Sequence, residues 1–182
     1  MRYSLSVSLL LGLLVACSAS KPVAGSKVPV TPFWTAELMD TVGKNTFRLE
    51  LSTPKAEITG IYIVKRVDGQ WRGTIINEFG VKVLDFVSAP HGCELKNVIP
   101  MLDKWYIKRV VASDIRFIME VDNPAFRPGA GAKRYITGDT LVVDYKGRQE
   151  LRRSPDGGVK YKNIKRALTY SLTGIESPKQ TE

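Results

Sequence analysis

The chain has 182 residues, 43% of them apolar, and a formal net charge of +9. This length suits one domain with a substantial hydrophobic core, and the apolar content excludes an intrinsically disordered protein. Two cysteines are too few for a small scaffold that disulfides hold together.

The first residues are typical of a signal peptide. Arg2 precedes an apolar run over residues 5–16, which is shorter than the roughly 20 residues that a membrane-spanning helix needs. The run ends in the sequence LVAC, which resembles the lipobox of bacterial lipoproteins. In that class the peptide is cut before the cysteine. We therefore expect residues 1–16 to be removed and Cys17 to become the lipidated first residue. The alternative is an ordinary secretory signal with a chance cysteine.

The same resemblance predicts where the protein resides. Acyl chains on Cys17 would anchor it stably to a membrane, because two or three chains bury enough methylene groups where one chain does not. Ser18 stands where an aspartate would imply retention in the inner membrane, so we expect the outer membrane and its periplasmic face. Residues 17–32 then form the lipidated N-terminus and a flexible tether. In this compartment the basic excess suits anionic lipid rather than nucleic acid.

Residues 33–39, 46–51 and 58–87 have the composition of β-strands. Asp68-Gly69 is a strong signal for a two-residue hairpin turn, and Phe79-Gly80 is a weaker one because phenylalanine is uncomfortable at positive φ. Two such turns join three strands into an antiparallel meander. The predicted register contains the pairs Tyr62–Ile75, Val64–Gly73, Arg66–Trp71, Ile75–Leu84 and Gly73–Phe86.

One face of this predicted meander is apolar, as expected for a sheet with one buried face. It carries Ile58, Tyr62, Val64, Trp71, Ile75, Leu84 and Phe86. The face has two interpretations: it lines a cavity for lipid, or it is a packed core beneath helices. Gly60 and Gly73 lie on it too, where a missing side chain either admits a helix closely or leaves room for a ligand.

Further elements follow along the chain. Residues 93–98 suggest a fourth strand, and residues 100–118 have the three-to-four spacing of a helix. Ser113 or Asp114 is suited to cap a second helix, which predicts a helical pair. A Pro/Gly loop over residues 122–134 precedes strands at 140–145, 149–153 and 159–172. The whole predicts one domain over residues 33–175 and a frayed tail over 176–182.

Three phrases within residues 55–120, GIYIVKR, NEFGVKVLDF and MLDKWYIKRVVASDIRF, are similar to lipoproteins of Bacteroidetes. These belong with the lipoprotein-localisation family, which comprises a periplasmic carrier and its outer-membrane receptor. The resemblance implies an α+β fold, mainly an antiparallel unclosed β-barrel, or half-barrel, wrapped over a central helical pair. It also implies an apolar cavity for acyl chains. The family has no short catalytic motif, so no functional residue is carried over.

Other candidate sites are weaker. His91 and Cys93 supply only two metal ligands, so we expect no metal and no cofactor. No nucleophile, phosphate or dinucleotide motif is present, and we expect no enzyme. The last third of the chain is strongly basic and is either a face for anionic headgroups or a solvated strand edge. The candidate headgroup residues are Arg148, Arg152, Arg153, Lys160, Lys162, Lys165 and Arg166.

The sequence thus predicts a membrane-anchored periplasmic lipoprotein that binds or transfers lipid or lipoprotein acyl chains. The alternative is an accessory envelope lipoprotein with a packed core, which acts through contacts with a partner protein. An enzyme acting on envelope polymers is the third possibility.

Overall fold

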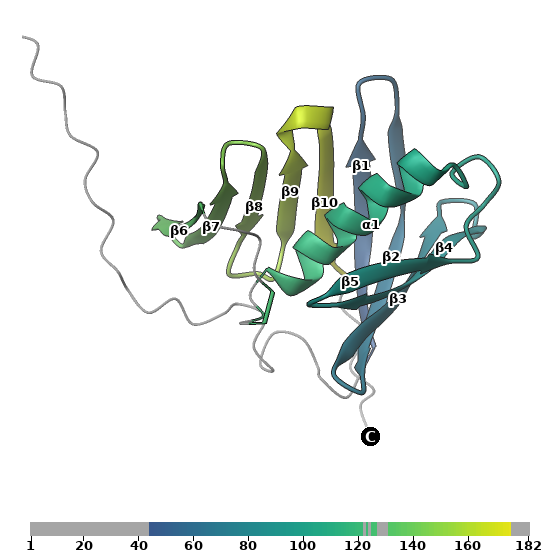
Figure 1. Ribbon diagram of the computed structural model, residues 1–182, viewed down its shortest axis with the longest axis horizontal. Coiled ribbons are helices and arrows are strands. Elements are labelled where there is room, and N and C mark those ends of the chain that lie inside the picture. Colours follow the sequence, from purple (N-terminus) through teal and green to yellow (C-terminus); the bar gives the residue numbers. More distant parts are fainter. Residues whose placement is uncertain (1–43, 122, 124, 127–130, 176–182) are drawn as a thin grey trace, which may run out of the picture.

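One ten-stranded antiparallel sheet and one helix make up the described part of the computed structural model, which covers residues 44–121, 123, 125–126 and 131–175 (Figure 1). The strands are β1 (Asn45–Ser52), β2 (Glu57–Val67), β3 (Gln70–Asn77), β4 (Lys82–Ala89), β5 (Gly92–Lys96), β6 (Ala132–Thr137), β7 (Thr140–Tyr145), β8 (Gln149–Arg153), β9 (Val159–Asn163) and β10 (Leu168–Gly174). The helix α1 spans Trp105–Glu120, and a short 3-10 helix η1 spans Ile164–Arg166.

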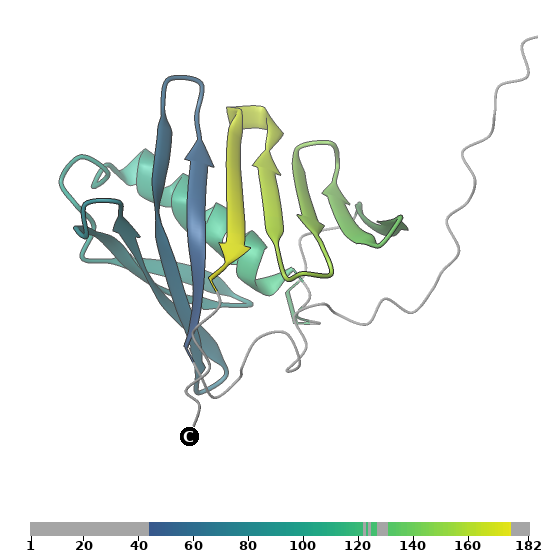
Figure 2. The same ribbon diagram turned by 180° about the vertical axis from the view of Figure 1, so that it is seen from behind.

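The strand order is β5-β4-β3-β2-β1-β10-β9-β8-β7-β6, so the first strand lies in the middle and pairs with the last. The sheet curves around α1 without closing, because β5 and β6 lie at its two ends (Figures 1 and 2). This confirms the predicted unclosed antiparallel half-barrel. The predicted helical pair is wrong, since α1 runs through residues 113 and 114 without a break.

The meander of β2, β3 and β4 has the predicted register. The pairs Tyr62–Ile75, Val64–Gly73, Ile75–Leu84 and Gly73–Phe86 are all present. Asp68 and Gly69 form the two-residue turn, both at positive φ (52° and 76°).

The second turn of the meander differs from the prediction. A register shift between Ile75 and Ile76 widens it, and the Asn77 side chain accepts hydrogen bonds from the amides of Phe79 (3.1 Å) and Val81 (2.8 Å). Gly80 alone takes positive φ there, at 78°. The wider turn therefore spares Phe79 the conformation that it disfavours.

In the second half of the sheet, β7 and β8 have the predicted bounds. The predicted strand over 159–172 is two strands, because η1 and Ala167, at φ 51°, interrupt it. Strand β6 begins inside the stretch predicted to be a loop. The predicted signal peptide, Cys17, the tether, the strand over 33–39 and the tail lie outside the described residues.

The core lies between the inner face of the sheet and the C-terminal half of α1. It forms one cluster that includes Phe47, Leu49, Ile115, Ile118 and Leu151, all less than 9% exposed. No helix in the described ranges has the length and apolar character needed to cross a membrane.

Candidate functional site

The face predicted to line a cavity is the inner face of β2, β3 and β4. Six of its seven side chains are buried, with exposed fractions between 1% and 8%: Tyr62, Val64, Trp71, Ile75, Leu84 and Phe86. The rings of Tyr62 and Phe86 lie 5.2 Å apart, and all six belong to the same core cluster as Ile115 and Ile118 of α1. Below the helix, this face is therefore packed. Ile58 differs, with 43% of its surface exposed.

The two glycines of this face admit neighbouring protein atoms. A Cβ on Gly73 would lie 2.3 Å from Cζ of Phe86 and 2.6 Å from the Ile63 carbonyl oxygen. A Cβ on Gly60 would lie 2.3 Å from the carbonyl oxygen of Ile76. Both glycines thus permit close packing within the sheet itself, which is neither the close approach of a helix nor the room for a ligand that the sequence suggested.

Packing changes abruptly along α1. Every residue from Asp114 to Glu120 except Arg116 is buried, whereas no residue from Trp105 to Ser113 is. The apolar residues of the N-terminal half, Ile107, Val110 and Val111 among them, are only half-buried. The helix is thus fixed at one end and loosely covered at the other.

Beyond the helix, the inner face of the sheet continues as an apolar strip, in which Leu51 and Leu168 are partly buried against the edge of the core and Ile58 is exposed. The β1–β2 hairpin and the start of β10 extend past α1 (Figures 1 and 2). Leu51 and Ile58 are paired across β1 and β2 and lie on the inner face, as Phe47 and Tyr62 do. Leu168 lies diagonally from Leu51 on the inner face of β10. We call Leu51, Ile58 and Leu168, with the N-terminal half of α1, the open end of the half-barrel.

A buried polar network fixes the C-terminal half of α1 to β9 and β10. The Asp114 carboxylate, completely buried, accepts hydrogen bonds from the hydroxyls of Tyr161 (2.7 Å) and Tyr170 (3.2 Å) and from the Asn163 amide (2.9 Å). Burial raises the pKa of Asp114, and the three donors and the nearby charge of Arg166 partly oppose that rise. Asp114 is therefore an anchor on the sheet and not the predicted helix cap.

Two further buried groups secure the same half of the helix. Nη2 of Arg153, 2% exposed, donates to the carbonyl oxygen of Ile118 at 3.0 Å. The Glu120 carboxylate accepts hydrogen bonds from Asn123 (3.0 Å) and Ser88 (3.4 Å), and burial raises its pKa. These contacts hold the C-terminal half of α1 more firmly on the sheet than the N-terminal half.

The sole histidine, His91, and Cys93 line the same surface hollow. Burial, with the nearby charge of Glu120 second, raises the pKa of Cys93 to about 12, which keeps its thiol protonated at neutral pH. Across the residues that the structure describes, no three His, Cys, Asp or Glu side chains gather to hold a metal ion.

Two segments, the β3–β4 turn and the stretch that leads into α1, carry exposed apolar side chains. Met101 (74% exposed) and Trp105 (73%) begin the helical segment, and Phe79 (81%) occupies the β3–β4 turn. A hydrogen bond of 3.0 Å from Ile99 N to the carbonyl oxygen of Val83 holds these two segments together. We call Phe79, Val81, Met101, Trp105 and Tyr106 the aromatic corner.

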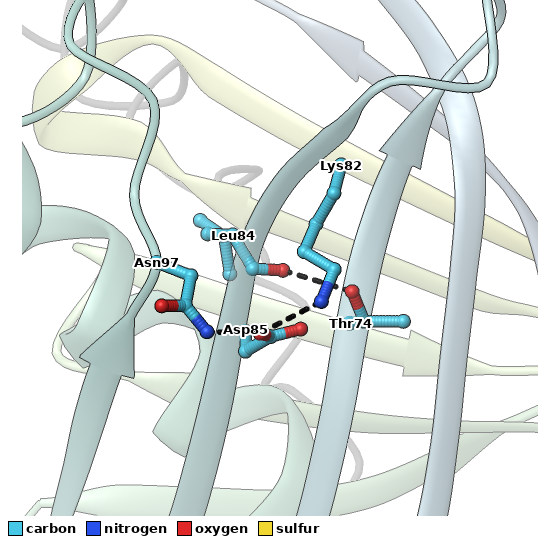
Figure 3. Close-up of polar contacts among 5 residues, drawn as sticks. All are labelled: Thr74, Lys82, Leu84, Asp85 and Asn97. Atoms are coloured by element: carbon cyan, nitrogen blue, oxygen red, sulfur yellow. Dashed lines mark hydrogen bonds and ion pairs between the residues drawn. The ribbon is translucent and has the colours of Figure 1, made fainter.

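Asp85 fixes the base of this corner (Figure 3). Its carboxylate accepts hydrogen bonds from Nδ2 of Asn97 (2.7 Å) and Nζ of Lys82 (3.1 Å), which join the turn after β5 to β4. Partial burial opposes the charge on Asp85, but the neighbouring Asn97, Thr74 and Lys82 groups outweigh it and lower its pKa. Asn97 adopts positive φ (49°) in this turn, so the side-chain contact helps to hold an uncommon backbone conformation.

The seven predicted headgroup residues do not share one face. Arg152, Lys160 and Lys162 lie on the convex side of the sheet, whereas Arg148, Lys165 and Arg166 are exposed in the turns at the open end. Arg153 is buried in the interior, so its place in a surface patch is wrong. Arg153 and Leu151 are two residues apart on β8, so their side chains point to the same face of the sheet. Because that face is apolar at Leu151, the sequence already contained a signal that Arg153 points to the interior.

No protein-family model and no curated protein matches the chain. A solved structure similar to it is that of MucB in complex with MucA(peri), with a TM-score of 0.37 and 12% sequence identity. The match covers 80% of this chain and 54% of that one, so the chain spans about half the length of the MucB structure.

Proposed function

We propose that the chain is an envelope lipoprotein, anchored to the outer membrane through Cys17, whose half-barrel binds an acyl chain at its open end. The single observation that carries the acyl site is the change of packing along α1. One half of the helix is fixed by a filled core and a buried polar network, and the other half leaves apolar side chains half-exposed.

An acyl chain fits the open end chemically. Ile58, Leu51 and Leu168 form a strip across three adjacent strands, which matches the linear shape of a hydrocarbon chain. Each methylene buried there contributes about 0.8 kcal/mol, so six to eight methylenes contribute about 5–6 kcal/mol, which matches the lower end of the cost of association. The filled core below the helix limits the ligand to this end.

The loosely packed half of α1 also allows the site to adjust. Segments with few buried apolar contacts open at a low cost in free energy. Trp105–Ser113 fits that description, while the contacts of Asp114, Arg153 and Glu120 hold the other half in place. We therefore expect an acyl chain to insert beside Ile107 and Val110, which are half-buried and do not belong to the core cluster.

The test compares two substitutions on one strand. Ile58→Glu puts a charge on the inner face of the open end, and Ile61→Glu puts the same charge on the convex face at a similar exposure (43% and 37%). We expect Ile58→Glu to weaken the binding of a C16 fatty acid by ten-fold or more, because a charge in an apolar site costs over 1.4 kcal/mol. Ile61→Glu should leave binding within two-fold. The measurement is displacement of a fluorescent fatty acid.

Thermal unfolding of both variants is the control for folding. Equal losses of binding in the two variants, with both folded, would refute the acyl site. So would saturable binding that neither substitution changes.

The aromatic corner favours a second function, contact with a partner protein in the envelope. Tryptophan, tyrosine and methionine are enriched at protein interfaces, and an exposed apolar patch is seldom without a role. Trp105 and Tyr106, with ring centroids 6.0 Å apart, have the size of an interface anchor. A protein that acts only through this corner would keep its function in the Ile58→Glu variant.

A further inference from the structure

Three exposed basic residues lie beside the apolar strip of the open end. Arg148 belongs to the turn between β7 and β8, and Lys165 and Arg166 belong to η1. A backbone hydrogen bond of 2.9 Å from Ile164 N to the carbonyl oxygen of Arg148 joins the two turns. Positive charge from two separate turns is thus brought to one place.

Ala167 connects this charge to the apolar strip. It takes the left-handed conformation, at φ 51°, directly between Arg166 and Leu168. Leu168 then enters β10 on the inner face, while Arg166 stays exposed on the turn. The charged surface and the apolar surface are therefore only two residues apart along the chain.

The three cations are exposed, although the charge of Arg166 also acts on the buried Asp114. Among the described residues, the ion pairs within 4.0 Å all involve other side chains. Nearby Arg152, by contrast, is neutralised by Glu150 at 2.8 Å.

The basic residues on the convex face of the sheet, unlike those at the open end, lie among acidic residues. On the convex face, Lys160 and Lys162 line a hollow together with Glu50 and Glu57, so that its two positive charges are balanced by two negative ones. Leu51 and Ile58, whose side chains lie on the inner face, also contribute to the lining of this hollow. An anion has less reason to bind there than at the open end.

We propose that the ligand is an anionic amphiphile whose acyl chain lies against Ile58, Leu51 and Leu168 and whose acidic headgroup lies on Arg148, Lys165 and Arg166. This inference rests on the proposed acyl site and adds the chemical class of its ligand. The exposed position of the cations makes the headgroup contribution sensitive to salt, since the Debye length is only about 8–10 Å at 0.1–0.15 M ionic strength.

The experiment compares two lysolipids that share a C16 chain, lysophosphatidylglycerol with a net charge of −1 and the zwitterionic lysophosphatidylcholine with a net charge of zero. Their affinities for the full mature chain are measured below the micelle concentration by displacement of a fluorescent fatty acid, at 50 mM and 500 mM NaCl. At low salt we expect the anionic lipid to bind about ten-fold more tightly, which corresponds to about 1.4 kcal/mol. At high salt the preference should largely vanish.

Two double variants locate the effect. Arg148→Gln/Lys165→Gln should reduce the preference to about two-fold and leave the affinity for lysophosphatidylcholine unchanged. Arg166 is kept in this variant because its charge acts on the buried Asp114. The matched control Lys160→Gln/Lys162→Gln, on the convex face, should keep the full preference.

Each other outcome contradicts the inference. Equal affinity of the wild-type chain for the two lipids would refute the headgroup site while leaving the acyl site in place. Binding of neither lipid would refute both. Displacement by glycerol phosphate as effective as by lysophosphatidylglycerol would show a site for free phosphate, and loss of the preference in the convex-face variant would place the headgroup elsewhere.

Discussion

Replacing Asp114 by alanine is expected to lower the free energy of unfolding by about 3 kcal/mol, because three buried donors lose their acceptor together. Tyr161, Asn163 and Tyr170 all donate to this one carboxylate, and all are buried. Release of the buried charge offsets part of the loss. Urea unfolding at neutral pH measures the difference from the wild-type chain.

Ser113→Ala is the matched control, since Ser113 precedes Asp114 on α1 and is exposed. It should change the free energy of unfolding by no more than about 0.5 kcal/mol. A similar small change for Asp114→Ala would mean that the network does not hold the helix.

The pH dependence of the same pair of proteins follows from the raised pKa of Asp114. The folded chain holds a proton on this group at pH values where the unfolded chain has lost it. The contribution of Asp114 to stability is therefore fully present below the unfolded pKa and is lost as pH rises through the folded pKa. The stability difference between wild type and Asp114→Ala should grow on acidification from neutral pH, and a difference that shrinks would contradict the raised pKa.

The substitution Gly73→Ala is expected to destabilise the fold by about 1–3 kcal/mol through overpacking. Its Cβ would meet the ring of Phe86 at 2.3 Å and the carbonyl oxygen of Ile63 at 2.6 Å. The ring can turn only into other core side chains, and the carbonyl belongs to the neighbouring strand. Thermal unfolding with calorimetry gives the size of the effect.

Gly92→Ala is the control, because nothing lies within 4 Å of its added Cβ. Phe86→Leu should recover part of the loss when combined with Gly73→Ala, since the smaller side chain makes room for the methyl group. If Gly73→Ala left the stability of the fold unchanged, this position would have space for a ligand.

The fold could be predicted from the sequence where residues that are neighbours in the chain determine a turn. The Asp68-Gly69 turn fixes the register of β2 and β3 through neighbours in sequence, so the pairs around Tyr62 followed from the sequence alone. Strand β6 was missed, although Gly138-Asp139 offered a similar signal. Thr137 pairs with Thr140 across that turn, and Gly138 has φ 63°.

The site depends on contacts between distant parts of the chain, which a single sequence does not reveal. In the sequence, Asp114 resembles a helix cap. Its true role does not show there, because its hydrogen-bond partners lie on strands 47 to 56 residues later in the chain. Ile58 follows the same alternation as Tyr62 and Val64, yet only the length of the hairpin beyond α1 leaves it exposed. The burial of Arg153 likewise needs the helix above β8, where it meets the carbonyl group of Ile118.

Photochemical cross-linking of a diazirine-bearing C16 fatty acid to the full chain tests the central claim most directly. Peptide mass spectrometry should place the adducts in residues 51–58 and in the N-terminal half of α1, and excess palmitate should abolish them. Adducts spread over the convex face, or adducts that palmitate does not compete away, would contradict an acyl site at the open end.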